Sequence, residues 1–328
     1  MEKIIIALLG LGTVGSQLLN YIEKNRELIR LRYHVQVILN PVFVRNLQKK
    51  RTVTFPLLTL TNDPQKSIRD ADIVIDCLGG DCTELTRDLV LSSLQGRKSV
   101  ILSSKKCLAF YGKEFIQVAK ENNVTFYYDA TVGGCIPISA VLAGMGRCEH
   151  ITRIYGICNA TSNFILEKMT QGIPYEEALA SAKVCGLVEN NPLEDVDGLD
   201  AVYKSVILAG FGMGEWEDPK TIIPSSIRNI SPDSLKRALE CDEVIKPIFS
   251  IEREGEKIIY QIGPKPVPKD SILAAVNKNH NVIVLDSNES GERAFIGQGA
   301  GARPTASAMF DDLVKILDTN YVQQEWKT

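Results

Sequence analysis

Runs of apolar residues alternate with amphipathic stretches through the first 130 residues of the chain. Residues 3–9 are almost all apolar, which is the pattern of a strand buried on both faces. Further strand patterns lie at 34–44, 72–77, 99–102 and 124–128, and helical spacing covers 82–95 and 106–122. Strands that alternate with helices predict a parallel, doubly wound α/β sheet.

The pattern changes after residues 133–137, where two glycines are followed by a proline. Helical patterns then dominate 161–214, and the segments 245–252 and 256–262 alternate apolar and polar residues around a Glu-Gly-Glu turn. A helix is also expected at 137–147, a strand at 151–158 and a last helix at 304–320. We therefore expect a second domain of the α+β class on a mixed or antiparallel sheet.

Length and composition limit the class of protein. A chain of 328 residues exceeds the usual size of one hydrophobic core, so two domains are expected. The net charge of -3 argues against a nucleic-acid-binding surface, which needs a basic excess. No apolar run reaches the roughly 18 residues of a membrane span, and the N-terminus has no signal-peptide pattern. The eight cysteines form no CxxC pair, so we expect reduced thiols, no zinc site and a soluble cytoplasmic protein.

A glycine motif, Gly10-Leu11-Gly12-Thr13-Val14-Gly15, follows the first predicted strand and opens an amphipathic helix. In Rossmann-type folds the three glycines permit a tight turn, a close approach to a pyrophosphate, and close packing of helix on strand. The helix N-terminus then faces the negative charge. The motif alone is also compatible with a tight structural turn, but its context favours dinucleotide binding.

The end of the second predicted strand indicates which dinucleotide is preferred. An acidic residue there binds the ribose of NAD, whereas an arginine accepts the 2′-phosphate of NADP. This chain has Arg45 and Asn46, then the basic run 49–51, and no acid between Glu27 and Asp63. NADP is favoured over NAD, although Asn46 suits either cofactor and a basic run of this kind is more often part of a solvated loop.

Two groups of charged residues are candidates for chemistry. Ser103-Ser104-Lys105-Lys106 ends the fourth strand, at the edge where ligands of open α/β sheets bind, and a lysine there can polarise a carbonyl oxygen. The two lysines are not distinguishable by local chemistry. An acidic and amide-rich stretch from Glu189 to Asp200 leads into an apolar helix in which Asp200 and Lys204 share one face. Such a pair is more often a surface ion pair, but the acidic loop beside it favours a polar cleft.

Together these motifs resemble the homoserine dehydrogenase family over nearly the whole chain. The family patterns match, in order, the segments 10–15, 45–47, 104–105, 132–137, 159–166, 189–204 and 299–306. In 189–204 the matching residues are Glu189, Pro192, Asp195, Gly198, Asp200 and Lys204. The resemblance selects Lys105 over Lys106 as the catalytic candidate.

The resemblance implies interconversion of L-homoserine and L-aspartate 4-semialdehyde in threonine and methionine biosynthesis. By the family pattern, Lys105 and Lys204 flank the reacting oxygen, Asp200 and Glu189 bind or orient the substrate, and Asp195 helps to hold its amino group. These types suit the chemistry, because an ammonium attracts carboxylates and a developing alkoxide attracts an ammonium. Ser103, Lys105 and Gly299 are expected to join the glycine motif and Arg45 in binding the cofactor.

Further features of the family extend these expectations. A monovalent cation, Na or K, would be bound by the backbone carbonyls of Asp129, Val132, Gly134 and Ile136. The dinucleotide-binding domain would span 1–135 and be completed by 299–328. The substrate-binding, catalytic and dimerisation domain would span 136–298 and form a homodimer. A chain of this length is expected to have neither the regulatory domain nor the fused kinase of some members.

Four positions depart from the family pattern. Asn191, Ser104, Cys135 and Ala160 replace an aspartate, an asparagine and two glycines of the family.

Three other functions are alternatives to this prediction. One is a dehydrogenase of another amino-acid semialdehyde. A second is an aldehyde dehydrogenase with Cys135 as nucleophile, which the lack of a nearby histidine in sequence disfavours. A third is a non-catalytic dinucleotide sensor, which would not need Lys105, Asp200 and Lys204.

Overall fold

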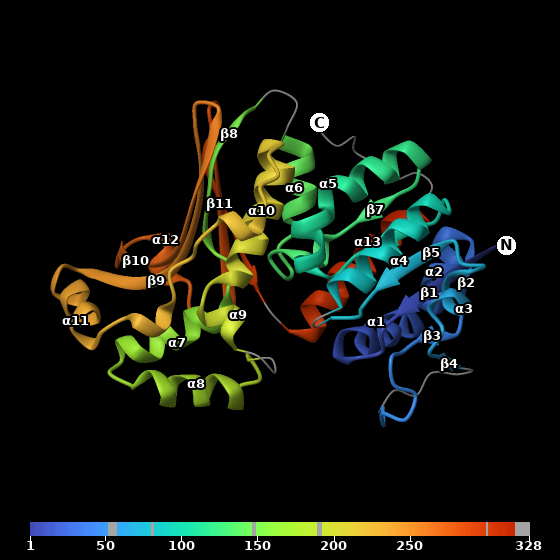
Figure 1. Cartoon of the computed structure of the whole chain (residues 1–328), viewed down its shortest axis with the longest axis horizontal. Helices are drawn as coiled ribbons and strands as arrows, with labels where there is room; N and C mark the ends of the chain where they lie inside the picture. Colours follow the sequence, from blue (N-terminus) through green and yellow to red (C-terminus); the bar gives the residue numbers. More distant parts are fainter. Residues whose placement is uncertain (52–57, 80–81, 146–148, 189–191, 300, 319–328) are drawn as a thin grey trace. The chain divides into compact units, whose positions relative to one another are not determined.

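The structure is a computed structural model that describes residues 1–51, 58–79, 82–145, 149–188, 192–299 and 301–318 (Figure 1). The chain divides into two compact units. Within the described residues, unit 1 comprises Met1–Thr131 and residues 302–318, and unit 2 comprises Val132–Gly301. The corresponding domain boundaries predicted from the sequence lie at residues 135 and 299. In the described part of the chain, no helix is long and apolar enough to cross a membrane.

Unit 1 is a parallel sheet in the order β4-β3-β1-β5-β6-β7, with β2 also paired to β1. The doubly wound sheet predicted from the alternating pattern is thereby confirmed. Its strands are β1 (Glu2–Leu9), β2 (Val35–Leu39), β3 (Val42–Phe43), β4 (Leu60–Thr61), β5 (Ile73–Asp76), β6 (Ser99–Ile101) and β7 (Phe126–Tyr127). Its helices are α1 (Thr13–Lys24), α2 (Arg26–Tyr33), α3 (Pro64–Ile68), α4 (Thr83–Gln95), α5 (Lys105–Asn122), the 3-10 turn η1 (Asp129–Thr131) and α13 (Ala302–Leu317).

The prediction of one continuous strand at 34–44 in unit 1 was wrong. The segment 34–44 is two strands, β2 and β3, that both pair with β1 and are separated by Asn40 and Pro41. Asn40 still donates its N–H to the carbonyl of Ile6. Proline has no N–H with which to continue the ladder, so the pairing is interrupted at Pro41.

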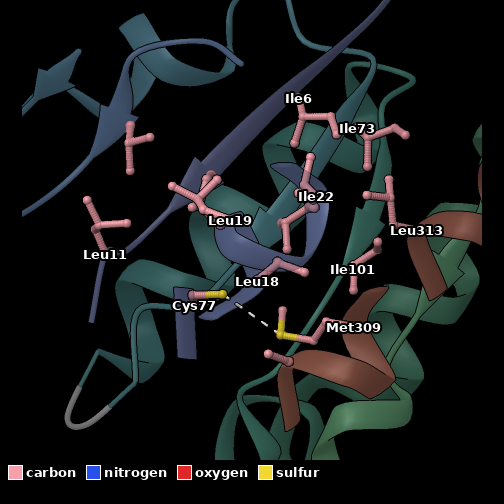
Figure 2. Close-up of a cluster of buried hydrophobic side chains, with 14 of the residues drawn as sticks. Ile6, Leu11, Leu18, Leu19, Ile22, Ile73, Cys77, Ile101, Met309 and Leu313 are labelled. Atoms are coloured by element: carbon pink, nitrogen blue, oxygen red, sulfur yellow. Dashed lines mark hydrogen bonds between the residues drawn. The ribbon is translucent and has the colours of Figure 1, made fainter. Parts of the chain in front are cut away.

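The C-terminal helix α13 packs into the core of unit 1. Its buried residues Ala306, Met309, Leu313 and Leu317 recur at helical spacing and join the cluster formed by β1, α1, β5 and β6. Figure 2 shows Met309 and Leu313 among the side chains of this cluster, with the sulfur of Met309 3.8 Å from that of Cys77. Residues from both ends of the chain therefore build one core.

A buried charged group also joins α13 to this unit. Lys315 Nζ lies 2.7 Å from a carboxylate oxygen of Asp129 on η1 and 2.9 Å from one of Asp312 on its own helix. Asp312 also accepts a hydrogen bond from the backbone N–H of Asp129 at 3.1 Å. Both carboxylates are buried, so they depend on the single ammonium for their charge balance.

Unit 2 is an antiparallel sheet in the order β10-β9-β8-β11-β12. Helices α7, α10 and α11 all contact β9, and α10 also contacts β8. Its strands are β8 (Ile151–Ile157), β9 (Glu243–Glu254), β10 (Lys257–Pro268), β11 (His280–Ser287) and β12 (Gly291–Gln298). Its helices are α6 (Ile138–Met145), α7 (Ala160–Thr170), α8 (Tyr175–Val184), α9 (Leu193–Val196), α10 (Leu199–Met213), η2 (Pro219–Thr221), η3 (Ile227–Asn229), α11 (Pro232–Glu240) and α12 (Ile272–Ala275).

Candidate active site

The glycine motif forms the turn between β1 and α1, as the sequence predicts. Gly10 has φ +104°, and a Cβ on it would overlap the carbonyl oxygen of Cys77, which follows the neighbouring strand β5. A Cβ on Gly15 would overlap the carbonyl oxygen of Gly10, so helix and turn approach as closely as backbones permit. Any side chain at these two positions would force α1 away from the sheet.

The middle glycine of the motif faces open space. Apart from Gly12 and its two chain neighbours, no atom of the described residues lies within 4 Å of the place that a Cβ on Gly12 would occupy, and Gly12 and Thr13 are both exposed. Gly12 is the N-cap of α1, and no described side chain caps this end of the helix. A helix N-terminus with room for a ligand attracts a phosphate group. The arrangement therefore fits the pyrophosphate of a dinucleotide.

The basic loop after β3 lies next to this turn. The N–H of Gly10 donates to the carbonyl oxygen of Phe43 at 2.8 Å, and Arg45 follows two residues later with an exposed side chain. Asn46 accepts the N–H of Gln48, while Arg51 donates to the carbonyl oxygens of Lys49 and Asn46. Asn46 and Arg51 thus hold the loop in shape, and Arg45 is exposed where a ribose phosphate is expected.

A buried carboxylate lies at the same edge of the sheet. Asp76 ends β5, is inaccessible to solvent, and accepts the N–H of Leu78 at 3.2 Å. Its other carboxylate oxygen is 3.5 Å from the hydroxyl of Ser103, and burial raises the pKa of Asp76 to about 6. The hydroxyl of Ser104 caps α5 by accepting the N–H of Cys107. Lys105 is the first residue of that helix and is half-buried, as is Lys106.

In unit 2, Asn159 joins the two aspartates that the sequence singled out. Its side-chain N–H groups donate to Asp195 at 2.7 Å and to Asp200 at 2.8 Å. Its side-chain oxygen caps α7 by accepting the N–H of Ser162. The hydroxyl of Ser162 in turn donates to the carbonyl oxygen of Asp195. One asparagine therefore fixes the start of α7 and two carboxylates that come from α9 and α10.

Lys204 completes this network. Its Nζ lies 2.8 Å from Asp200 Oδ2, and it donates to the carbonyl oxygen of Cys158 at 2.6 Å. The side chains of Asp200 and Lys204 are only 1% and 11% exposed. This i,i+4 pair is therefore not a surface ion pair, the alternative that its spacing alone would favour. An ammonium has three N–H donors, and these two contacts leave the third for a substrate oxygen. The polar residues form a preorganised cluster inside the protein.

Four further residues were singled out in the sequence, and the structure describes two of them. Glu189 and Asn191 lie outside the described residues. Cys135 is exposed, and its N–H donates to the carbonyl oxygen of Gln298, so the turn accepts a cysteine where the family pattern has glycine. Ala160 is buried as the first residue of α7.

The cation site predicted at backbone carbonyls remains a prediction. The carbonyl oxygen of Ile136 accepts the N–H of Ile138 at 2.7 Å, and the Asp129 carboxylate binds Lys315. Among the described residues there is no group of three or more histidine, cysteine or acidic side chains that could hold a metal ion.

Asn281 contacts the network around Lys204, and the sequence analysis did not single it out. A Cβ on Gly299, the first glycine of the C-terminal motif, would overlap the side chain of Asn281. Asn281 is completely buried at the start of β11, and its Nδ2 donates to the carbonyl oxygen of Cys158, the same oxygen that Lys204 contacts. The sequence signal is weak, because Asn281 is one of three asparagines between residues 277 and 281.

The cysteines of the described chain are free thiols. Burial raises the pKa of Cys77 and of Cys107 well above the ordinary value for a thiol. Buried thiols of this kind do not ionise readily and so are poor nucleophiles. Hydride transfer with polar side-chain assistance thus suits this site better than covalent catalysis at either of these thiols.

Known proteins match the chain along nearly its whole length. A model of the homoserine dehydrogenase NAD-binding domain matches residues 10–129, and a homoserine dehydrogenase model matches residues 137–314. The homoserine dehydrogenase of Bacillus subtilis is 35% identical over 97% of this chain and 73% of its own length. The crystal structure of a homoserine dehydrogenase from Thiobacillus denitrificans has a TM-score of 0.90 at 31% identity and covers 99% of this chain and 77% of its own. A hyperthermophilic archaeal homoserine dehydrogenase in complex with NADPH has a TM-score of 0.78 at 25% identity and covers 98% of this chain and 100% of its own.

Proposed function

The chain belongs to the homoserine dehydrogenase family, and from this premise we propose which of its residues perform the reaction. The protein is an NAD(P)-dependent oxidoreductase that interconverts L-homoserine and L-aspartate 4-semialdehyde in amino-acid biosynthesis. The observation that carries the proposal is the buried network of Asn159, Asp195, Asp200 and Lys204.

We assign Lys204 to the reacting oxygen. Reduction of the aldehyde places negative charge on that oxygen, and oxidation of the alcohol removes a proton from it. An ammonium held at a fixed position donates a hydrogen bond to the developing alkoxide and supplies the proton in reduction, and the neutral amine takes up the proton in oxidation. Asp200 and the Cys158 carbonyl hold Nζ from one side, which leaves its third N–H for the substrate. We assign Lys105 of unit 1 to the same reaction as a second lysine.

The carboxylates of unit 2 are assigned to the substrate's amino group. L-Homoserine carries an ammonium beside its carboxylate, and charge-assisted hydrogen bonds to carboxylates recognise such a group. Asp195 is half-buried and receives one N–H from Asn159, so its position is set before the substrate arrives. Asp200 is turned toward Lys204 and orients it. Glu189, outside the described residues, is proposed as a further acidic contact.

The dinucleotide would be held in unit 1. Gly10, Gly12, Thr13, Val14 and Gly15 would bind the pyrophosphate, and Ser103 and Lys105 of the same unit would contribute further contacts. Gly299 belongs to unit 2, and its contact with the cofactor stays a prediction from the family resemblance. When bound, the nicotinamide supplies the hydride acceptor for oxidation and the hydride donor for reduction. We propose NADP as the preferred form, because Arg45 is exposed beside the glycine turn and no acid lies between Glu27 and Asp63.

We also propose a homodimer formed through unit 2. Strand β12 is an edge of the antiparallel sheet and carries Ile296, whose side chain is largely exposed. Edge strands with exposed apolar residues are commonly covered by a partner. Light scattering of the purified protein tests this, and a mass of one chain at micromolar concentration would contradict it.

Substrate recognition is tested with a substrate that lacks the amino group. 4-Hydroxybutyrate has the alcohol and carboxylate of homoserine but no ammonium. The carboxylates of unit 2 therefore have no positive charge on it to bind. Asp195→Asn keeps an oxygen to accept the N–H of Asn159 but removes the charge. It should lower kcat/KM for L-homoserine about tenfold or more, and change that for 4-hydroxybutyrate less than about threefold.

The matched control is the neighbouring aspartate. Asp197 is paired with Arg228 and accepts the hydroxyl of Ser226, outside the network around Lys204. Asp197→Asn should leave kcat/KM for both substrates within about threefold of the unmodified enzyme. An equal loss on both substrates in Asp195→Asn would contradict the assignment of Asp195 to the ammonium.

A further inference from the structure

Asn281 is a buried amide whose side chain makes one hydrogen bond in the described structure. Its Nδ2 donates to the carbonyl oxygen of Cys158 at 3.2 Å. Its Oδ1 is buried and accepts no hydrogen bond within the described structure. A carbonyl oxygen left without a partner in the interior destabilises the folded state.

The hydrogen bond to the Cys158 carbonyl is the only one that the Asn281 side chain makes in the described structure, and it stabilises the folded state by less than the unpartnered oxygen destabilises it. The net gain from one neutral hydrogen bond is smaller than the cost of leaving one buried polar atom without a partner. A small apolar residue at position 281 would therefore serve stability at least as well as asparagine. Buried polar groups that lack partners call for an explanation other than stability, and catalytic sites are a common one.

The partner of Asn281 indicates what this explanation is. The Cys158 carbonyl oxygen also accepts a hydrogen bond from Lys204 Nζ at 2.6 Å. Cys158 lies directly after β8 and before Asn159, the residue that holds Asp195 and Asp200. The direction of this one peptide group therefore affects the ammonium position, and Asn281 is the side chain that fixes the peptide group from the opposite strand β11.

Position 299 is adapted to the same amide. A Cβ on Gly299 would overlap Cγ, Oδ1 and Nδ2 of Asn281, so the amide packs directly against the glycine backbone. Gly299 N–H donates to the carbonyl oxygen of Asn279, which keeps the two segments together. Two positions of the chain are thus committed to holding an amide that adds no net stability.

We propose that Asn281 is a positioning residue for the reaction, which orients the Cys158 carbonyl and through it the Lys204 ammonium. The inference rests on the function proposed for Lys204. Asn281 itself is too deeply buried to touch the substrate. Its removal should lower the rate of the chemical step and leave binding of the cofactor intact.

Two variants at this position test the proposal. Asn281→Ala removes the donor and should lower kcat by about tenfold or more, with the Kd of NADPH changed less than about twofold. Asn281→Asp keeps the shape of the side chain but can donate to the carbonyl only when protonated. Its kcat relative to the unmodified enzyme should therefore rise as pH falls, a dependence that a purely structural role would not produce.

Asn163 provides a matched control in the same unit. It is as completely buried as Asn281, but its Nδ2 donates to the carbonyl oxygen of Val276 and its Oδ1 accepts from Lys246. Asn163→Ala should lower the melting temperature more than Asn281→Ala does, because it breaks a satisfied network. The folded Asn163→Ala enzyme should retain kcat within about threefold.

A double-mutant cycle separates this proposal from the one on which it rests. If Asn281 acts through Lys204, Asn281→Ala should have less than about a twofold effect on kcat in a Lys204→Ala background. An effect as large as in the unmodified background would overturn the positioning role, as would an Asn281→Ala enzyme with unchanged kcat. A Lys204→Ala enzyme with unchanged kcat would instead overturn the role proposed for Lys204.

Discussion

Asp200 and Lys204 lie one turn apart on α10 and form an ion pair of 2.8 Å that is almost completely withdrawn from solvent. Burying two charges is unfavourable unless further hydrogen bonds satisfy them. Here Asn159 donates to Asp200 and the Cys158 carbonyl accepts from Lys204, so each charge has a second partner. The pair is therefore held in one geometry before the substrate binds, which is what electrostatic catalysis requires.

The two adjacent lysines at the start of α5 are predicted to behave differently. Both are half-buried, and only the family pattern selects Lys105. Lys105→Ala should lower kcat about 100-fold or more, because it removes an ammonium from the reacting oxygen. Lys106→Ala should stay within about threefold. Steady-state kinetics with L-homoserine measures both, and the reverse order of effects would show that the wrong lysine was selected.

Arg45 is predicted to determine the choice of cofactor. Loss of a charge-assisted contact with the 2′-phosphate should weaken binding of NADPH about tenfold, and NADH carries no such phosphate. Arg45→Ala should therefore raise the Kd of NADPH and leave that of NADH within about twofold, as measured by nicotinamide fluorescence. Lys50→Ala in the same loop is the control. A ratio of the two affinities that does not change in Arg45→Ala would rule out this role.

Asp76 is predicted to make stability depend on pH. Burial raises its pKa from 3.8 to about 6, so the folded protein binds a proton that the unfolded chain has already released between those values. Stability is then lost as the pH rises through this window, by about 3 kcal/mol in total. Asp76→Asn resembles the protonated form.

Chemical denaturation of Asp76→Asn measures this effect. The variant should unfold with a free energy about 3 kcal/mol higher than the unmodified protein at pH 7.5, and with a difference of only about 0.5 kcal/mol at pH 4. A variant that is less stable than the unmodified protein at pH 7.5 would show that the ionised carboxylate is favourable where it lies.

Lys315 is predicted to be essential for the attachment of α13. Lys315→Met leaves Asp129 and Asp312 buried without their cation, which should lower the free energy of unfolding by about 3–5 kcal/mol. Burial and the charge of Asp129 raise the pKa of Asp312, and loss of the ammonium raises it further. The loss of stability should therefore be greater at pH 8 than at pH 5.

An exposed lysine gives the comparison for this experiment. Lys236 is 4.0 Å from Glu240 on the surface of α11, and both side chains are well exposed. Lys236→Met should change the free energy of unfolding by less than about 0.5 kcal/mol at either pH. Equal effects of the two substitutions would mean that the triad in unit 1 does not stabilise the fold.

Local patterns were sufficient to predict much of unit 1. A buried apolar strand, a glycine turn and an amphipathic helix are encoded within residues 3–24, and all three form as expected. Strands β11 and β12 were not predicted. β11 is buried along most of its length, and a short apolar run alone does not distinguish a strand from a helix. The exposed and half-buried residues of β12 alternate, but its sequence mixes glycine, charged and apolar residues.

The candidate site was predicted only in part for a related reason. Helical spacing places Asp200 and Lys204 on one face of α10, but it does not indicate whether that face is buried. Burial depends on Asn159 and Cys158, which lie more than 40 residues earlier in the chain. The role of Asn281 depends on a contact across 123 residues, which no local pattern contains. Long-range contacts of this kind require the fold.

The central claim is that Lys204 assists hydride transfer from inside the buried network. The most direct measurement is single-turnover reduction of L-aspartate 4-semialdehyde by NADPH-loaded Lys204→Ala enzyme, with the Kd of NADPH determined on the same sample. We expect a rate at least about 100-fold below that of the unmodified enzyme and a Kd within about twofold. A rate within about threefold, or a loss of NADPH binding equal to the loss of rate, would contradict the claim.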